Sequence, residues 1–121
     1  MHTKELCAMK SLFDQRLILR TRLGVQIVLK GQLVYLKGSG SYTDYYILKD
    51  GALKRNQQSG NLAIHAAKLD DRFLRISKSC YVNLDFVEYI GADRSVKLSV
   101  PTSEPLTISV RYWKQIQRFL G

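Results

Sequence analysis

Three short polar segments of this chain carry side chains that hydrogen-bond to phosphate oxygens and to the edges of nucleic-acid bases. They are residues 37–43 (Lys-Gly-Ser-Gly-Ser-Tyr-Thr), 75–79 (Arg-Ile-Ser-Lys-Ser) and 109–111 (Ser-Val-Arg). Lysine, arginine, serine and threonine commonly contact DNA phosphates, and arginine also recognises guanine in the major groove. Taken singly, each segment is equally typical of a solvated turn. Their meaning therefore depends on whether the fold brings them together.

Residues that could support catalysis are few. The two histidines, His2 and His65, have no partner at metal-ligand spacing, and we expect His65 to be a surface or partly buried side chain. Asp70 and Asp71 are adjacent, so their carboxylates point apart and are better explained as a helix-end cap. The sequence has no nucleophile elbow, phosphate-binding loop or zinc-protease helix. We therefore expect no enzyme, no metal site and no cofactor.

The cysteines and the apolar runs indicate the compartment. Cys7 and Cys80 are far apart and outside any metal-ligand spacing, which favours two reduced thiols. No apolar run approaches the roughly 20 residues that span a bilayer, and the N-terminal residues lack the apolar core and cleavage site of an export signal. We expect a cytoplasmic protein that does not contact the membrane.

The charge balance favours an anionic partner. Nineteen Lys and Arg residues against ten Asp and Glu residues leave a net charge of +9. Such an excess attracts anions, and nucleic acid is the leading candidate because each neutralised phosphate releases condensed counterions. The cations are scattered along the chain and do not form a block, which indicates a folded basic surface. From residue 106 to the end there are three cations and no acid: Arg111, Lys114 and Arg118.

The length and the apolar pattern predict one strand-rich domain. A chain of 121 residues with 45% apolar residues can bury one substantial core. Residues 50–51 (Asp-Gly) favour the type I′ turn of a hairpin. Alternating or β-branched runs predict strands at residues 16–22, 25–29, 34–37, 45–49, 52–56, 73–76, 80–83, 86–90, 96–100 and 106–109.

Two or three short helices accompany these strands. Leu6, Met9 and Phe13 have helical spacing and predict an amphipathic helix over residues 4–14. Ser59 or Asn61 can cap a second helix that carries Leu62, Ala66 and Leu69 on one face and ends near residues 68–70. Ser109 can cap a terminal helix with an apolar stripe made of Trp113, Ile116 and Leu120. The predicted fold class is mainly β.

Residues 72–85 resemble the hallmark segment of LytTR-type DNA-binding domains, which has the form Phe-x-Arg-x-His-Arg/Asn-Ser-x-x-Val-Asn. Phe73, Arg75, Ser79, Val82 and Asn83 match this pattern. Residues 33–42 are similar to the extended run before the first recognition loop of that family. Residues 106–111 resemble its penultimate strand and Ser-x-Arg ending. The resemblance covers residues 16–120, and the order and spacing of the three pieces are specific.

The chain departs from the family pattern at two positions. Ser77 stands where the family often has histidine, and Cys80 where an aromatic residue is usual. The first departure removes any role for an aromatic ring at that position. The second is expected to alter packing only.

The resemblance implies an elongated, antiparallel β-fold of several small sheets that binds double-stranded DNA in transcription regulation of bacteria. Such domains insert loops into successive major grooves. Residues 1–15 would form a helical extension and residues 16–121 the domain itself. A second copy on an adjacent half-site and a separate sensor or receiver protein are the further partners that the resemblance suggests.

The resemblance also implies which residues touch DNA. By position, the base contacts carry over to Thr43, Lys78 and Arg111. Candidates for contacts to the DNA backbone are Arg20, Arg22, Lys37, Ser39, Arg75, Ser77 and Ser79.

A different kind of binding module is the alternative. The same basic face could hold RNA or an acidic protein, and Tyr42, Tyr45 and Tyr46 could stack on unpaired bases if they are exposed. Core packing is the commoner fate for at least one of these tyrosines. Stacking predicts a preference for single strands over duplex DNA.

Overall fold

The computed structural model describes residues 15–119, and the predicted helix at residues 4–14 lies outside them, as do His2, Cys7 and Leu120. The described residues form strands and short helices in the order β1 (Arg16–Thr21), β2 (Gly24–Leu29), η1 (Lys30–Gln32), β3 (Leu33–Ser39), β4 (Tyr42–Lys49), β5 (Ala52–Ser59), α2 (Leu62–Ala66), β6 (Phe73–Ser77), β7 (Cys80–Asn83), η2 (Leu84–Phe86), β8 (Val87–Ile90), β9 (Ser95–Leu98), β10 (Leu106–Thr107) and α3 (Val110–Gln117).

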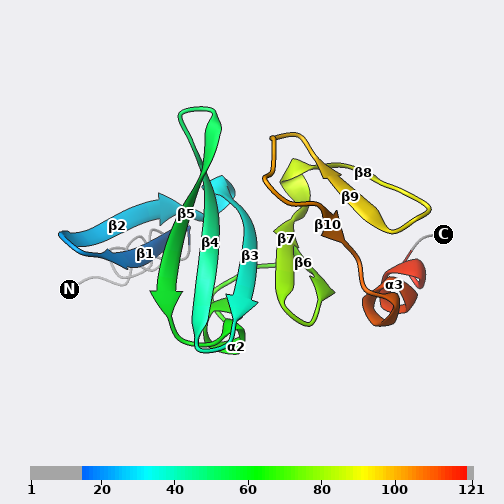
Figure 1. Ribbon diagram of the computed structural model, residues 1–121, viewed down its shortest axis with the longest axis horizontal. Helices are drawn as coiled ribbons and strands as arrows, with labels where there is room; N and C mark the ends of the chain where they lie inside the picture. Colours follow the sequence, from blue (N-terminus) through cyan, green and yellow to red (C-terminus); the bar gives the residue numbers. More distant parts are fainter. Residues whose placement is uncertain (1–14, 120–121) are drawn as a thin grey trace, which may run out of the picture.

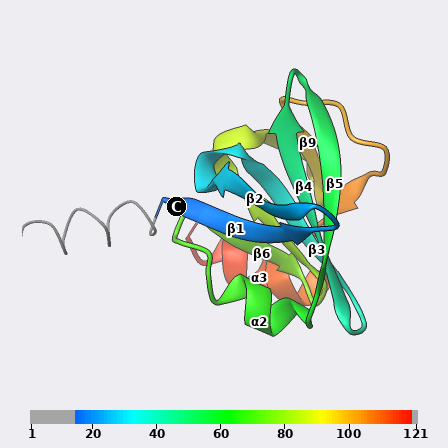
Figure 2. The ribbon, with the colours of Figure 1, turned by 90° about the vertical axis from the view of Figure 1, so that its left-hand side faces the viewer.

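The strands form three antiparallel sheets along the long axis of the molecule (Figure 1). The central sheet has the strand order β5-β4-β3-β7-β6, the β1–β2 hairpin lies beyond β5, and a three-stranded sheet of β10, β9 and β8 lies on the other side of the molecule. Figure 2, seen from the hairpin side, shows β1 and β2 crossing the central sheet with α2 below them. The predicted fold class is confirmed.

Strand β3 is buried on both faces because the sheet is covered on both sides. Leu33, Val34, Tyr35 and Leu36 are all fully buried, which explains why this run is continuously apolar and does not alternate. Leu33 and Leu36 belong to the core shared with the β1–β2 hairpin. Val34 and Tyr35 belong to the core shared with the three-stranded sheet and α3. Strand β3 thus holds the two halves of the molecule together.

The hairpin of β4 and β5 turns at Asp50 and Gly51 as predicted. Their φ angles are 54° and 78°, and a type I′ turn requires positive φ at both central residues. This turn projects at the top of Figure 1, away from α2.

Helix α2 begins at the predicted cap and ends earlier than predicted. The side chain of Asn61 accepts a hydrogen bond from the backbone N–H of Ile64 at 3.1 Å, and the helix ends at Ala66. The expectation of a surface or partly buried His65 is wrong, because this side chain is buried. Its Nε2 donates to the Ser59 carbonyl at 2.8 Å, since a carbonyl oxygen only accepts, and its Nδ1 forms a hydrogen bond of 2.6 Å with the Tyr45 hydroxyl. The imidazole therefore joins α2 to β4 and β5.

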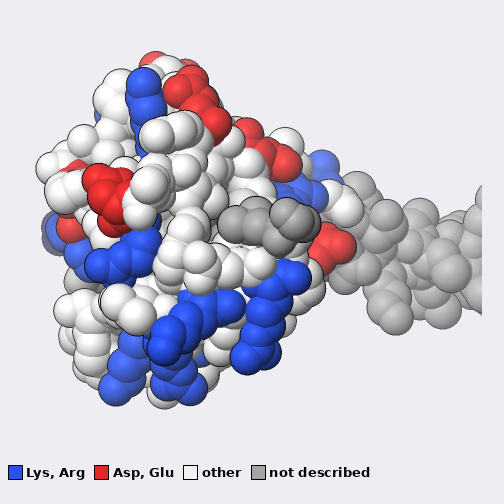
Figure 3. Space-filling view, turned by 90° about the vertical axis from the view of Figure 1, so that its right-hand side faces the viewer, with Lys and Arg blue, Asp and Glu red and all other residues white. Residues whose placement is uncertain are grey.

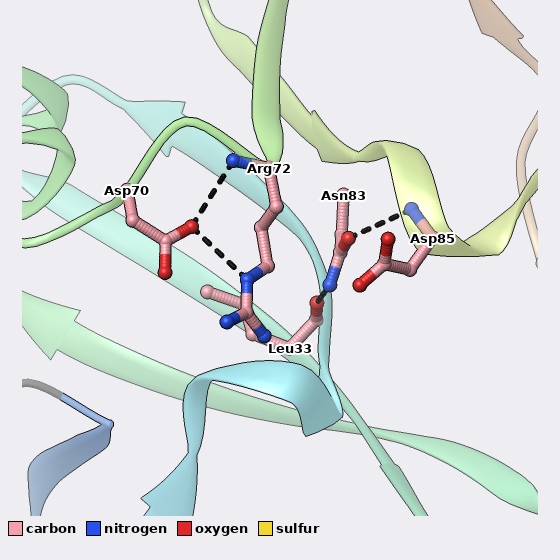
Figure 4. Close-up of polar contacts among 5 residues, drawn as sticks. All are labelled: Leu33, Asp70, Arg72, Asn83 and Asp85. Carbon is pink, nitrogen blue, oxygen red and sulfur yellow. Dashed lines mark hydrogen bonds and ion pairs between the residues drawn. The ribbon is translucent and has the colours of Figure 1, made fainter.

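Asn83, at the end of the hallmark segment, is a structural residue (Figure 4). It is fully buried. Its side-chain amide donates to the Leu33 carbonyl at 2.9 Å and accepts from the backbone N–H of Asp85 at 2.9 Å. The first bond ties β7 to the start of β3, and the second fixes the turn after β7. The final asparagine of the pattern thus supports the fold and is not available to DNA.

Candidate nucleic-acid interface

The three polar segments lie side by side on one edge of the molecule. The backbone N–H of Gly38 donates to the Ser79 carbonyl at 2.8 Å, which joins the end of β3 to the β6–β7 turn. The backbone N–H of Ser109 donates to the Ile76 carbonyl at 2.8 Å, which joins the start of α3 to β6. We call residues 37–42, 77–80 and 109–111 the polar edge, and it runs along the bottom of Figure 1.

Arg75 organises the middle segment of the polar edge. Its Nε donates to the Ser77 carbonyl at 3.1 Å and its Nη2 to the Lys78 carbonyl at 2.7 Å. The guanidinium carbon also lies 5.4 Å from the ring centre of Tyr81 and 5.3 Å from that of Tyr112, within range of cation–π attraction. Arg75 therefore positions the β6–β7 turn, and in this conformation its donors are directed to protein groups.

The side chains of Lys78 and Arg111 are exposed on the polar edge. Lys78 stands in the β6–β7 turn and Arg111 in the first turn of α3, with its guanidinium carbon 5.8 Å from the ring centre of Tyr112. The segments that carry them are directly joined by the Ser109–Ile76 hydrogen bond. Both residues can therefore reach a ligand that lies along this edge.

Helix α3 adds two cations that were not among the predicted DNA contacts. Lys114 and Arg118 follow Arg111 at the i+3 and i+7 positions, which share one helix face, and all three are exposed. Ile116 lies on the opposite face and is buried in the core. The i+3 and i+7 spacing of these cations in the sequence is the pattern from which the basic stripe could be predicted. Figure 3 shows the right-hand side of Figure 1, where α3 lies, and on it Lys and Arg side chains gather on the lower part, with Asp and Glu mainly above.

The structure does not expose the side chain of Thr43, which the resemblance assigns as a base contact. Its side chain is fully buried, and its hydroxyl donates to the Gly60 carbonyl at 2.9 Å. The reason is that β4 is covered on both faces here, since the next two residues, Asp44 and Tyr45, are buried as well. The first segment instead exposes Ser39, Ser41 and Tyr42.

Four further residues that were predicted to contact the DNA backbone lie on this edge: Lys37, Ser39, Ser77 and Ser79. Ser39 and Ser79 are exposed, and the Ser77 hydroxyl accepts from the backbone N–H of Ser79 at 3.3 Å. Lys37 is half-buried, and its Nζ lies 2.7 Å from Oε2 of Glu104. This hydrogen bond raises the pKa of the Lys37 ammonium group, which stays charged.

Arg20 and Arg22 are not brought to the polar edge. Both are exposed, but they belong to the β1–β2 hairpin, which lies beyond β5 at the far end of the central sheet from β6 (Figure 1). The side-chain amide of Gln58 in β5 holds the hairpin by pairing with the backbone N–H and carbonyl of Arg20 at 3.1 and 2.8 Å.

Of the three tyrosines considered for base stacking, one is available. Tyr45 is fully buried in the core, as expected for at least one of them. The half-buried ring of Tyr46 stacks on Tyr35 with ring centres 4.1 Å apart and planes 10° from parallel. Tyr42 is half exposed at the β3–β4 turn. Among these three tyrosines, one exposed ring offers no platform for successive unpaired bases.

Other kinds of site are not apparent in the described part of the chain. Cys80 is buried and unpaired, and burial raises the pKa of its thiol to about 12, so it stays protonated. Residues 15–119 hold no cluster of three or more His, Cys, Asp or Glu side chains placed to bind a metal ion. Over the same residues, no helix has both the length and the apolar character needed to cross a bilayer.

Comparisons with known proteins agree with this picture. A solved structure described as the LytTr DNA-binding domain of a methyl-accepting/DNA response regulator from Bacillus cereus is similar, with a TM-score of 0.70 and 22% sequence identity. The match covers 88% of this chain and 97% of that one, and it supports the fold. No curated protein sequence matches. The family model of the LytTr DNA-binding domain matches residues 27–121. The chain therefore belongs to the LytTR family of DNA-binding domains.

Proposed function

We propose that this domain binds double-stranded DNA at specific sequences to regulate transcription, with the loops of the polar edge inserted into successive major grooves. The observation that carries this proposal is the pair of 2.8 Å backbone hydrogen bonds that join the three polar segments side by side. A row of loops on one edge can follow one face of a duplex without a recognition helix. The domain acts as a binding module and catalyses no reaction.

Arg111 makes the principal base contact in this proposal. Its guanidinium is exposed at the start of α3, and a guanidinium can bridge O6 and N7 of guanine, which discriminates between bases by about 1–3 kcal/mol. Lys78 has only an ammonium group, so it contacts either a base or a phosphate. Both side chains extend from segments that hydrogen bonds hold in place.

The phosphate contacts come from the periphery of the same edge. Ser39 and Ser79 present exposed hydroxyl groups, and Lys114 and Arg118 extend the basic stripe of α3. Arg20 and Arg22 reach the DNA backbone only if the duplex continues beyond the polar edge to the β1–β2 hairpin. Only the cations contribute to the salt dependence, and about five phosphates neutralised by Lys78, Lys114, Arg118, Arg20 and Arg22 predict a log–log slope of binding against salt of about −4 to −5.

The same proposal extends to the number of copies on DNA, the source of the signal and the compartment. Two copies bind adjacent half-sites, a separate sensor or receiver protein supplies the signal, and the protein acts in the cytoplasm, where DNA is accessible. The family supports the DNA partner in this proposal.

Selection of bound duplexes from a random pool tests the proposal. We expect enrichment of a defined sequence, repeated when two copies bind, and weaker binding to single-stranded DNA of equal length. A slope near zero in the salt titration, or a preference for the single strand, would contradict it. The second result would favour the alternative in which bases stack on exposed tyrosine.

A further inference from the structure

Lys37, one of the cations of the polar edge, is held by a carboxylate from a distant part of the chain. Its Nζ lies 2.7 Å from Oε2 of Glu104, which belongs to the segment between β9 and β10. The other carboxylate oxygen, Oε1, accepts from the Tyr35 hydroxyl at 3.4 Å. Glu104 is thus aimed at β3 from outside the central sheet.

The pair lines a hollow that opens beside the β6–β7 turn. The hollow has a volume of about 240 Å³, and its walls include Ser77, Ser79 and Thr107 together with Lys37 and Glu104. Among the side chains that line it, Lys37 is the one cation and Glu104 the one carboxylate. The surrounding hydroxyl groups and the ammonium group are the donors that a DNA phosphate uses. In the protein without DNA, the Glu104 carboxylate occupies the place beside Lys37 that a phosphate would take.

Replacing the Glu104 carboxylate by a phosphate as the partner of Lys37 costs little free energy. The side chains of Lys37 and Glu104 are 40% and 33% exposed, and ion pairs of this kind add little to stability because water screens them. The hydrogen bond to Glu104 raises the pKa of Lys37, so the group remains a cation when a phosphate approaches. A duplex on the polar edge must therefore compete with Glu104 for this charge.

We propose that Glu104 competes with a DNA phosphate for the ammonium group of Lys37 and thereby weakens the hold of the domain on DNA. This inference rests on the proposed function, because it requires a duplex on the polar edge. It assigns Glu104 a role in setting affinity, although a carboxylate makes no favourable contact with a phosphate.

The test is the variant Glu104→Gln, which removes the charge: its amide oxygen can still accept from Nζ of Lys37, and its NH2 group can donate to the Tyr35 hydroxyl. We expect duplex binding, measured by fluorescence anisotropy, to tighten about two- to fivefold at 0.15 M salt. The salt slope should steepen by about 0.9, since one more phosphate is neutralised. Thermal unfolding followed by circular dichroism checks that the variant is folded.

Two further variants make the result specific to this pair. Asp50→Asn removes one negative charge from the β4–β5 turn, on the opposite side from the polar edge, and asparagine tolerates the positive φ there. We expect its DNA affinity and slope to equal those of the wild type. Replacing Lys37 by Met in the Glu104→Gln background should return the slope to the wild-type value.

The outcomes separate the two proposals. If the wild-type protein binds no duplex, the proposed function fails. If the wild type binds duplex DNA but Glu104→Gln brings no gain, the competition by Glu104 is overturned and the proposed function stands. An equal gain in Asp50→Asn, or a gain that persists without Lys37, would also overturn it, because either result attributes the effect to net charge alone.

Discussion

Nη2 of Arg75 in β6 donates a hydrogen bond of 2.7 Å to the backbone carbonyl of Lys78, so one cation shapes the turn that presents a second, exposed cation. Nε of the same guanidinium binds the carbonyl of Ser77. The β6–β7 turn therefore holds its conformation before any DNA arrives, which reduces the entropy lost on binding.

Replacing Arg75 by Lys should weaken binding to the preferred duplex by about tenfold, as expected when hydrogen bonds from a charged group, worth about 1.5–3 kcal/mol, are lost. Lysine keeps the charge but cannot form the two-pronged contact with both carbonyls. Hydrogen exchange at residues 77–80 should accelerate in the same variant. Full affinity in Arg75→Lys would instead show that Arg75 acts through its charge alone.

Replacing Arg111 by Ala should weaken binding to the preferred duplex by about 10- to 100-fold, because a guanidinium bridge to guanine discriminates by about 1–3 kcal/mol. Binding to random duplex should weaken about threefold or less. Arg55, an exposed arginine of β5, is the matched control, and Arg55→Ala should leave the ratio of the two affinities unchanged. An equal loss on both duplexes in Arg111→Ala would mark Arg111 as a phosphate contact.

Replacing Thr43 by Val should lower the free energy of unfolding by about 1–2 kcal/mol, because the Gly60 carbonyl loses its partner. The DNA affinity of the folded variant should stay within twofold of the wild type. Urea unfolding and anisotropy measure the two quantities. Thr21→Val, at the exposed end of β1, removes the same hydroxyl group and should change the stability by less than about 0.5 kcal/mol. A large loss of DNA affinity in Thr43→Val would restore this residue as a DNA contact.

Replacing Asn83 by Ala should lower the free energy of unfolding by about 2–4 kcal/mol, since it leaves the Leu33 carbonyl and the Asp85 N–H without their partner. At temperatures where the variant is folded, its affinity for DNA should match that of the wild type. A stable variant that no longer binds DNA would place Asn83 in the interface.

Local sequence signals predicted the elements of this fold well. Asp50 and Gly51 form the expected turn, and Asn61 caps α2, because both depend on neighbouring residues only. The family pattern around Arg75 and Asn83 identified a segment that the structure uses to shape a turn and to tie β7 to β3. These two polar residues of the pattern thus act within the protein: Arg75 shapes the β6–β7 turn, and Asn83 joins β7 to β3.

Contacts between residues far apart in the chain could not be predicted from the sequence. Thr43 lies in a loop-like polar segment, yet packing on both faces of β4 buries it, and nothing local signals the second layer. The ion pair of Lys37 and Glu104 joins residues 67 positions apart. His65 is likewise buried by a tyrosine from β4 and a carbonyl from β5. In each case the tertiary fold decides which polar groups face solvent.

Titration of the ¹⁵N-labelled protein with its selected duplex tests the central claim most directly. The account predicts that backbone amide signals of residues 39–42, 77–80 and 109–111 shift together at the same DNA concentration, while those of residues 50–51 stay in place. Shifts concentrated at the β4–β5 turn, or confined to a single one of the three segments, would contradict the claim that the polar edge holds DNA.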